Sequence, residues 1–445
     1  MNCENLVLLT WYGFLGVLGQ GILFISGKSY TITHTILAIP NSENFLLLPH
    51  SAKLLDSLLV EVVNLRLDLL LVKVMFRLFH KPFRVFGQAL LPKELADPRR
   101  ILVTHFGNIA EAIQSVPVFV ALRNRFPYAE ITWLIGEHAA PLLLDHWAVN
   151  RFIVVQNDWT GHLSEIRRIR QRLQSFAPQV AIDLQNSFGS SLASWLSCAK
   201  YRIGFGGRAR RHLHNIRVVP EETHQIERNL RLLQPFGIFG TDIGFDMPEC
   251  EKDRITARNI LHRKGLYGNF AMLHISTENP ATRWQDERYG VVAKYLLEQW
   301  NLPSLIVWSG DESEQRRAET AVHAAGGAAL QAPWTSLVER KSLSKLATIF
   351  VGSETAELQI AAAVETKCIG LFSSVSALAN IPFGQGHRAV CVEPESKRKR
   401  AIVPERMDTI LPESVCEQCD EVLTGLLQPS TVPIRPMQHT YRKAA

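Results

Sequence analysis

A lone carboxylate is the first candidate for chemistry in this chain. Glu111 lies in the stretch THFGNIAEAIQSVP, which follows a short apolar run at 101–103. After it, Ile113, Val116, Val120 and Leu122 have the spacing of one apolar helix face. Glu111 is therefore expected at or near a strand-to-helix turn. Open α/β sheets gather ligands and catalytic groups at such turns, where strands reach their carboxyl ends.

Polar residues also follow four apolar runs in the later sequence, at 276–277, 311–314, 353–355 and 373–374. Any one of these residues could be an ordinary helix cap. Four sets along one sheet edge favour a ligand instead, since hydroxyls and backbone amides before helix starts suit a pyrophosphate. The carboxylates of Glu314 and Glu354 suit ribose or sugar hydroxyls. Ser276, Thr277 and Thr355 complete this set of candidates.

The elements that must position these residues alternate regularly from about residue 99 onward. Short apolar strands (ILVTHF, ITWLIG, RFIVVQ, VAIDLQ, RIGF) are separated by helical stretches, and a second series runs AMLHIS, LPSLIVWSG, ATIFVGS, KCIGLFSS and RAVCVEP. Alternation of this kind predicts βαβ units with parallel sheets. Glycines and a proline at 236–248 predict a linker. We therefore expect an α/β protein with two Rossmann-like domains facing a cleft, at 99–240 and 241–428, between an extension at 1–98 and a tail at 429–445.

Composition limits the class of protein and its partners. At 445 residues the chain exceeds what one hydrophobic core usually supports, and 47% hydrophobic with 20% charged residues is typical of a globular protein. A net charge of +6 permits an anionic substrate or membrane but does not indicate nucleic acid. No P-loop or dinucleotide fingerprint occurs. The 7 scattered cysteines indicate a cytoplasmic protein, and the pair Cys416 and Cys419 has no zinc-site partners in sequence.

The first hundred residues differ from the rest. Residues 6–25 are almost wholly apolar, a poor signal peptide and only marginally long enough to span a bilayer. Residues 54–79 have amphipathic helical spacing, with Lys73, Arg77, Lys81 and Arg84 near the end of this stretch. This segment is expected either to pack on the catalytic domain or to lie on the inner face of the cytoplasmic membrane, at an anionic surface.

Five further stretches, in order and at matching spacing, accompany ILVTHFGNIAEAIQSVPVFVALRNRFPYAEITWLIGEHAAPLL. They are VAIDLQNSFGSSLASWLSCAKYRIGF, HQIERNLRLLQPFGI, LHISTENPATRWQDERYGVVAKYL, VGSETAELQIAAAVETKCIGLFSS and DTILPESVCEQCDEVL. Together they resemble glycosyltransferase family 9, the ADP-heptose:lipopolysaccharide heptosyltransferases, over about residues 99–428.

The resemblance implies a GT-B fold with an acceptor-binding first half, a nucleotide-sugar-binding second half, and inverting transfer without an essential metal or cofactor. It implies a nucleotide-sugar donor, such as ADP-heptose, and a glycolipid acceptor like the lipopolysaccharide core. The family's general base, the aspartate of a G-D turn, falls on Glu111. His105 and Asn108 of the same stretch are then expected on the acceptor side.

The chain also departs from the family pattern. A lysine falls on Thr282, beside which Arg283 is expected to supply positive charge to the leaving pyrophosphate. The D-T-G-x-x-H signature appears as Glu354, Thr355, Ala356 and Gln359, which the resemblance places at the donor site. Two functions therefore stay open: a working glycosyltransferase, or an inactive relative that binds a nucleotide sugar, a glycolipid or a protein partner.

Overall fold

A computed structural model describes residues 93–427, apart from 157, 207–212, 221–222, 241–242, 278, 374–379 and 393–406. The predicted apolar segment at 6–25, the amphipathic segment at 54–84 and the tail at 429–445 lie outside the described residues. Among the residues that are described, no helix is both long enough and apolar enough to cross a membrane.

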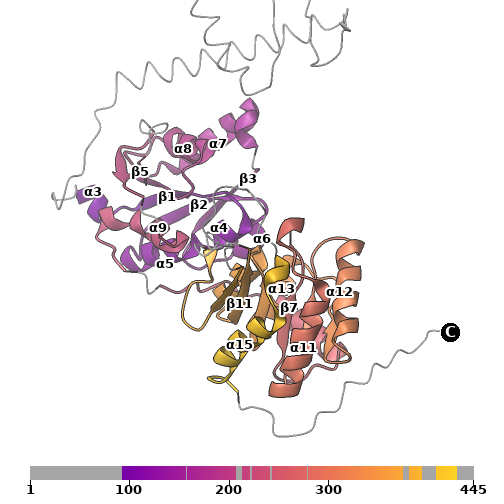
Figure 1. The fold of residues 1–445 in the computed structure, drawn as a ribbon. Coiled ribbons are helices and arrows are strands. Elements are labelled where there is room, and N and C mark those ends of the chain that lie inside the picture. The colour runs from indigo at the N-terminus through magenta and orange to yellow at the C-terminus, as the bar shows by residue number, and fades with distance from the viewer. Residues whose placement is uncertain are drawn as a thin grey trace, which may run out of the picture. The chain divides into compact units, whose positions relative to one another are not determined.

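The first half of the described chain contains a parallel sheet of six strands in the order β3-β2-β1-β4-β5-β6, drawn from indigo to magenta in Figure 1. The strands are β1 (Arg100–Thr104), β2 (Glu130–Gly136), β3 (Arg151–Val155), β4 (Val180–Asp183), β5 (Tyr201–Phe205) and β6 (Ile216–Val218). All neighbouring pairs run parallel, for example Val103 opposite Trp133 and opposite Ile182. The helices of this half are α3 (Lys93–Ala96), α4 (Ile109–Ile113), α5 (Val116–Arg125), α6 (Ala140–Leu143), α7 (Leu163–Phe176), α8 (Phe188–Leu196) and α9 (Gln225–Arg231), with 3-10 turns η1 (Trp159–Gly161) and η2 (Gln234–Phe236).

The second half contains another parallel sheet of six strands, in the order β12-β11-β10-β7-β8-β9. Its strands are β7 (Ala271–His274), β8 (Ser304–Val307), β9 (Ala329–Gln331), β10 (Ile349–Ser353), β11 (Lys367–Phe372) and β12 (Arg388–Cys391). Its helices are α10 (Glu251–Arg263), α11 (Asp286–Trp300), α12 (Glu312–Ala324), α13 (Leu337–Leu346), α14 (Ala356–Ala363) and α15 (Pro412–Leu423), with turns η3 (Pro280–Thr282) and η5 (Met407–Thr409). Between the halves, the described residues of 237–250 form no helix or strand.

The two predicted parallel sheets are therefore present. The central strands are buried on both faces, as in β1, where only Arg100 is exposed, and this accounts for their continuous apolar runs. Helix α7 has buried residues on one side only, Ile169, Leu173 and Phe176, which is the amphipathic pattern of a helix covering a sheet. Two strands were missed, β6 and β9, because three residues are too short for a recognisable period.

The connectivity of each sheet reverses at one point. In the first sheet the chain passes from β1 outward to β2 and β3 and then returns to β4 on the other side of β1. In the second sheet it passes from β7 to β8 and β9 and returns to β10 on the other side of β7. Ligands of open α/β sheets bind outside the carboxyl ends of the strands at such switch points. The turns after β1, β4, β7 and β10 are therefore the expected positions of a ligand site.

The two halves share part of one core. Ile360 and Ala363, on α14 of the second half, belong to the same buried apolar cluster as Ile113 and Val116 of the first half. Helix α14 also packs against α4, the short helix that carries Glu111. The switch points of the two sheets are thereby brought to one region.

Candidate functional site

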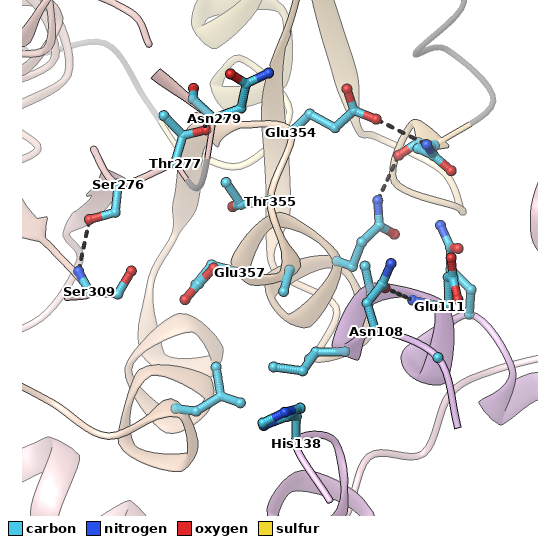
Figure 2. Close-up of a pocket in the computed structure, with 18 of the residues that line it drawn as sticks. Asn108, Glu111, His138, Ser276, Thr277, Asn279, Ser309, Glu354, Thr355 and Glu357 are labelled. Carbon is cyan, nitrogen blue, oxygen red and sulfur yellow. Dashed lines mark hydrogen bonds between the residues drawn. The ribbon is translucent and has the colours of Figure 1, made fainter. Parts of the chain in front are cut away.

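A cavity of about 1430 Å³ opens at both switch points and is lined by residues of both halves. Figure 2 shows Glu111 and Asn108 on one side of it and Ser276, Thr277, Glu354 and Thr355 on the other. Ten of the sequence-predicted site residues line this cavity: Asn108, Glu111, Ser276, Thr277, Arg283, Glu314, Glu354, Thr355, Ala356 and Gln359. His105 does not line it but lies buried directly behind Glu111. Of the fourth polar set, Ser373 is not among the lining residues and Ser374 lies outside the described residues.

The turn after β1 folds Glu111 back over its own loop. Asn108 caps α4, and its side-chain oxygen accepts a hydrogen bond from the backbone N–H of Glu111 at 2.9 Å. A Cβ added to Gly107 would come 2.1 Å from Glu111 Oε2, so only glycine leaves room for the carboxylate in this position. Glu111 Oε2 lies 3.7 Å from His105 Nε2.

Burial shifts the pKa of both Glu111 and His105. The Glu111 side chain is 43% exposed, and its partial burial raises the pKa of the carboxyl against the opposing effect of the Asn108 hydrogen bonds. The imidazole of His105 is fully buried, which lowers its pKa to about 4, so it is neutral at pH 7. A carboxylate with a raised pKa beside a neutral imidazole is the arrangement expected of a general base.

A second buried group, Asp183, lies at the end of β4, the strand beside β1. Asp183 Oδ2 accepts a hydrogen bond from Ser191 at 2.7 Å and lies 3.0 Å from His214 Nε2. Burial alone would raise the pKa of Asp183, but the hydrogen bonds and the charge of His214 keep it below its usual value. The negative charge of Asp183 also raises the pKa of His105, but by less than burial lowers it. Asp183 is thus a fixed negative charge beneath the cavity wall.

On the opposite wall, the N-terminal residues of α14, Thr355, Ala356 and Glu357, line the cavity. Thr355 is the N-cap of this helix, but its side chain makes no capping hydrogen bond, and its buried Oγ1 has no partner among the described residues. Ser276 Oγ accepts the backbone N–H of Ser309 at 2.8 Å, which leaves its own proton available to a ligand. Free N–H groups and hydroxyls at a helix N-terminus form an anion-binding site.

Arg283 lines the cavity but is only loosely held. Its Nη2 lies 3.5 Å from Glu314 Oε1, and its side chain is 40% exposed. Glu314 is held more firmly by Arg317, whose Nη1 donates to both carboxylate oxygens at 2.9 and 3.0 Å. Arg317 also donates to Asp286 at 2.7 Å. Since Glu314 stays compensated by Arg317, Arg283 can turn toward a phosphate without leaving a buried carboxylate unpaired.

The remaining predicted donor residues are held by two separate sets of hydrogen bonds. Asn380 Nδ2 donates to Glu354 Oε1 at 3.0 Å, and its backbone carbonyl accepts from Gln359 Nε2 at 2.6 Å. Thr282, where the family pattern has lysine, hydrogen-bonds Thr277 at 2.9 Å. Gln359 and Thr282 therefore hold neighbouring segments in place through neutral hydrogen bonds.

Sequence reasoning missed a buried charged group in the second wall. Glu357 Oε1 accepts from Arg340 Nη2 at 3.1 Å and lies 3.8 Å from His274 Nε2, and all three residues line the cavity. Burial would raise the pKa of Glu357, but the charges of His274 and Arg340 bring it below its usual value. The only signal in the sequence was the helix start ETAELQ itself, where Glu357 follows Thr355 by two residues.

Two all-parallel sheets whose switch points open onto one cavity define the chain as an α/β protein of the GT-B class. The family model for glycosyltransferase family 9 (heptosyltransferase) matches residues 166–408. Lipopolysaccharide heptosyltransferase 3 of Escherichia coli K12 is 22% identical over 285 residues, 59% of this chain and 79% of the relative.

Solved structures give the same fold. A family 9 glycosyl transferase from Veillonella parvula has a TM-score of 0.61 at 16% identity, covering 74% of this chain and 98% of its own. The ADP-heptose lps heptosyltransferase II of E. coli has a TM-score of 0.58 at 20% identity, covering 73% of this chain and 99% of its own. The chain belongs to glycosyltransferase family 9, the heptosyltransferase family.

Proposed function

We propose that this chain is an inverting glycosyltransferase that moves a sugar, heptose, from ADP-heptose to a glycolipid acceptor like the lipopolysaccharide core. The observation that carries the proposal is the meeting of two switch points at one cavity, with Glu111 on one wall and the N-terminus of α14 on the other. The relatives support the donor and acceptor, since one is described as an ADP-heptose lps heptosyltransferase.

In this reaction the second wall holds the donor. The diphosphate binds at the N-terminus of α14, where Thr355 Oγ1 and the free N–H groups meet it and Arg283 adds positive charge. Ser276 and Thr277 donate from the turn after β7, and Glu354 accepts from sugar or ribose hydroxyls. Ala356 and Gln359 complete this wall. The first half, 99–240, then serves as the acceptor domain and 241–428 as the donor domain.

The chemistry needs one proton transfer and one displacement. Glu111 takes the proton of the acceptor hydroxyl as its oxygen attacks the anomeric carbon of the donor sugar. The bond from that carbon to the diphosphate breaks on the opposite face, which inverts the configuration. Negative charge that develops on the diphosphate is stabilised by Arg283 and by the N–H groups of α14. Glu111, Arg283 and the N–H groups of α14 are the protein groups that act in this step.

A donor screen tests the proposal directly. Thermal unfolding of the full chain is measured with ADP-heptose, GDP-mannose and UDP-glucose, each at a concentration well above the expected dissociation constant. A ligand at about one hundred times its Kd stabilises the folded state by about 2.7 kcal/mol. We expect ADP-heptose to raise the unfolding temperature and the other two to leave it unchanged. If none of the three nucleotide sugars has an effect, the donor assignment is wrong.

The Arg283→Ala variant is expected to bind ADP-heptose about 1.5 to 3 kcal/mol more weakly, because it loses a charge-assisted contact to the diphosphate. Titration calorimetry measures the change. Arg316→Ala is the matched control, since Arg316 is exposed, pairs with Glu312 and does not line the cavity. Equal affinity of Arg283→Ala and the control would place the Arg283 side chain outside the donor contacts.

We further propose that the enzyme works in the cytoplasm at the inner face of the membrane and that residues 54–84, known here from sequence alone, hold it there. Each basic residue near an anionic surface contributes about 1 kcal/mol. The full chain should sediment with anionic liposomes at low salt, and a chain lacking residues 1–84 should stay folded and soluble without sedimenting. Aggregation of the shortened chain, together with full-length protein that ignores liposomes, would instead assign the segment to the core.

A further inference from the structure

The first wall of the cavity carries an aromatic ring with no role in the reaction described so far. Phe188 lines the cavity and is 53% exposed, whereas Phe106 and Trp159 beside this wall are buried. It is the first residue of α8, which follows β4 after a short turn at the switch point of the first sheet. An exposed aromatic side chain in a pocket is the kind of surface that binds a ligand with an apolar face.

The local structure holds this residue in a fixed place. Ser187 and Ser190 form a capping box at the start of α8, with the backbone N–H of Ser190 bonded to Ser187 Oγ at 3.1 Å. A Cβ on Gly189 would meet Phe106 Cζ at 3.0 Å and Thr160 Cγ2 at 3.3 Å, so α8 packs closely on the turns behind it. Phe106 is itself held by an edge-on contact with Trp159, with ring centroids 6.2 Å apart.

Two polar side chains of neighbouring turns, Gln185 and Thr160, line the same wall of the cavity as Phe188. Gln185 Oε1 accepts the backbone N–H of Phe106 at 3.2 Å, which fixes the amide and leaves its NH₂ group without a partner among the described residues. The Thr160 hydroxyl also has no partner within the described part of the chain, and both residues line the cavity. An aromatic face, an amide donor and a hydroxyl on one cavity wall match the two kinds of surface on a saccharide ring, its C–H face and its hydroxyls.

The charge of this wall selects among saccharides. Of the described first-half residues that line the cavity, none is Lys or Arg, and the only carboxylate is that of Glu111. Of the two arginines of the second wall, Arg340 pairs with Glu357, and Arg283 is assigned to the donor diphosphate. A carboxylate or phosphate on the acceptor ring would therefore lie near Glu111 without a compensating cation, which is unfavourable.

We propose that Phe188, Gln185 and Thr160 form the acceptor subsite and that it takes an uncharged saccharide ring. The ring stacks its C–H face on Phe188, while Gln185 and Thr160 bind its hydroxyls and orient one of them toward Glu111. This inference rests on the proposed transfer reaction and adds the chemical class of the acceptor unit. It predicts that sugar acids and sugar phosphates are disfavoured at this position.

Saturation-transfer NMR on the full chain tests the subsite with two probes of equal ring size, methyl α-mannopyranoside and mannose 6-phosphate, with and without saturating ADP. The neutral probe should receive saturation and the phosphorylated probe should receive little. Phe188→Ala should weaken binding of the neutral probe by about threefold to tenfold, the effect of losing one aromatic contact, and Phe188→Trp should retain it. Phe239→Ala is the matched control, since Phe239 is 76% exposed and does not line the cavity.

The inference is overturned if the neutral probe does not bind, if mannose 6-phosphate binds equally well or better, or if Phe188→Ala and Phe239→Ala behave alike. Nucleotide binding is scored separately on the same samples by thermal unfolding. If the neutral probe does not bind but ADP-heptose still raises the unfolding temperature, only the subsite proposal is wrong. If the neutral probe binds in a way that depends on Phe188 but no nucleotide sugar changes the unfolding temperature, the proposed function is wrong and the subsite proposal is retained.

Discussion

Replacement of Glu111 by Gln is expected to lower the rate of transfer by about 10² to 10⁴, the usual contribution of a positioned general base. Glutamine has nearly the same shape, so the close fit over Gly107 and the cap from Asn108 are retained while the basicity is lost. Donor binding should stay within about threefold of wild type. Transfer of labelled sugar and calorimetric titration of ADP-heptose on the same samples measure the two effects.

The pH dependence of the wild type provides an independent check on Glu111. The base must be ionised to act, and burial raises the pKa of this carboxyl, so kcat/KM should fall as the pH drops through a value above that of an ordinary glutamate. His105 adds no second inflection to the pH profile of kcat/KM near neutrality, because its pKa lies near 4. Full transfer by Glu111→Gln would assign the base elsewhere. A wild type that binds ADP-heptose but transfers nothing would support the inactive relative.

Arg317→Leu is expected to destabilise the folded chain by about 2 to 4 kcal/mol, because it leaves Glu314 and Asp286 without their cation in a largely buried place. The Arg317 side chain is only 14% exposed, and it also donates to the backbone carbonyl of Ile275 at 3.2 Å. Urea unfolding followed by tryptophan fluorescence measures the loss. Donor affinity should also fall, since Arg283 would then be held as the remaining partner of Glu314.

The neighbouring residue provides the control for this prediction. Arg316 pairs with Glu312 at 3.5 Å on the solvent side of the same helix, with 75% of its side chain exposed. Arg316→Leu should change the free energy of unfolding by no more than about 0.5 kcal/mol, since exposed ion pairs contribute little. Equal losses in the two variants would mean that the buried ion pairs of Arg317 do not support this wall.

The sequence predicted where the site lies better than how it is held together. Glu111 and Thr355 were proposed because each follows an apolar strand at the start of a helix, and the structure places both at such turns and in the cavity lining. The pairing of Glu314 with Arg317 could also have been predicted from the sequence, since the two are three residues apart on one helix. The partner Asp286, 31 residues away from Arg317, was not, because helix α11 must first pack beside α12.

The groups behind the cavity walls depended even more on tertiary structure. His105, Asp183 and His214 come from three separate segments, and only the parallel pairing of β1 with β4 brings the first two together. Phe188 was a different kind of omission, since it follows the strand VAID in the way that Glu111 follows RILVT. The rule that found one strand-end residue would have found the other if it had been applied to aromatic side chains as well as polar ones.

The contact of α4 with α14 also limits how the enzyme can move during a catalytic cycle. One helix carries the proposed base and the other begins at the proposed diphosphate site, so a rotation of one half against the other about this contact would keep these two ends close together. Ile360 and Ala363, buried in the first-half core, resist separation at this point. If the two halves rotate about this contact, the far rim of the cavity would widen for substrates while the proposed catalytic groups keep their spacing.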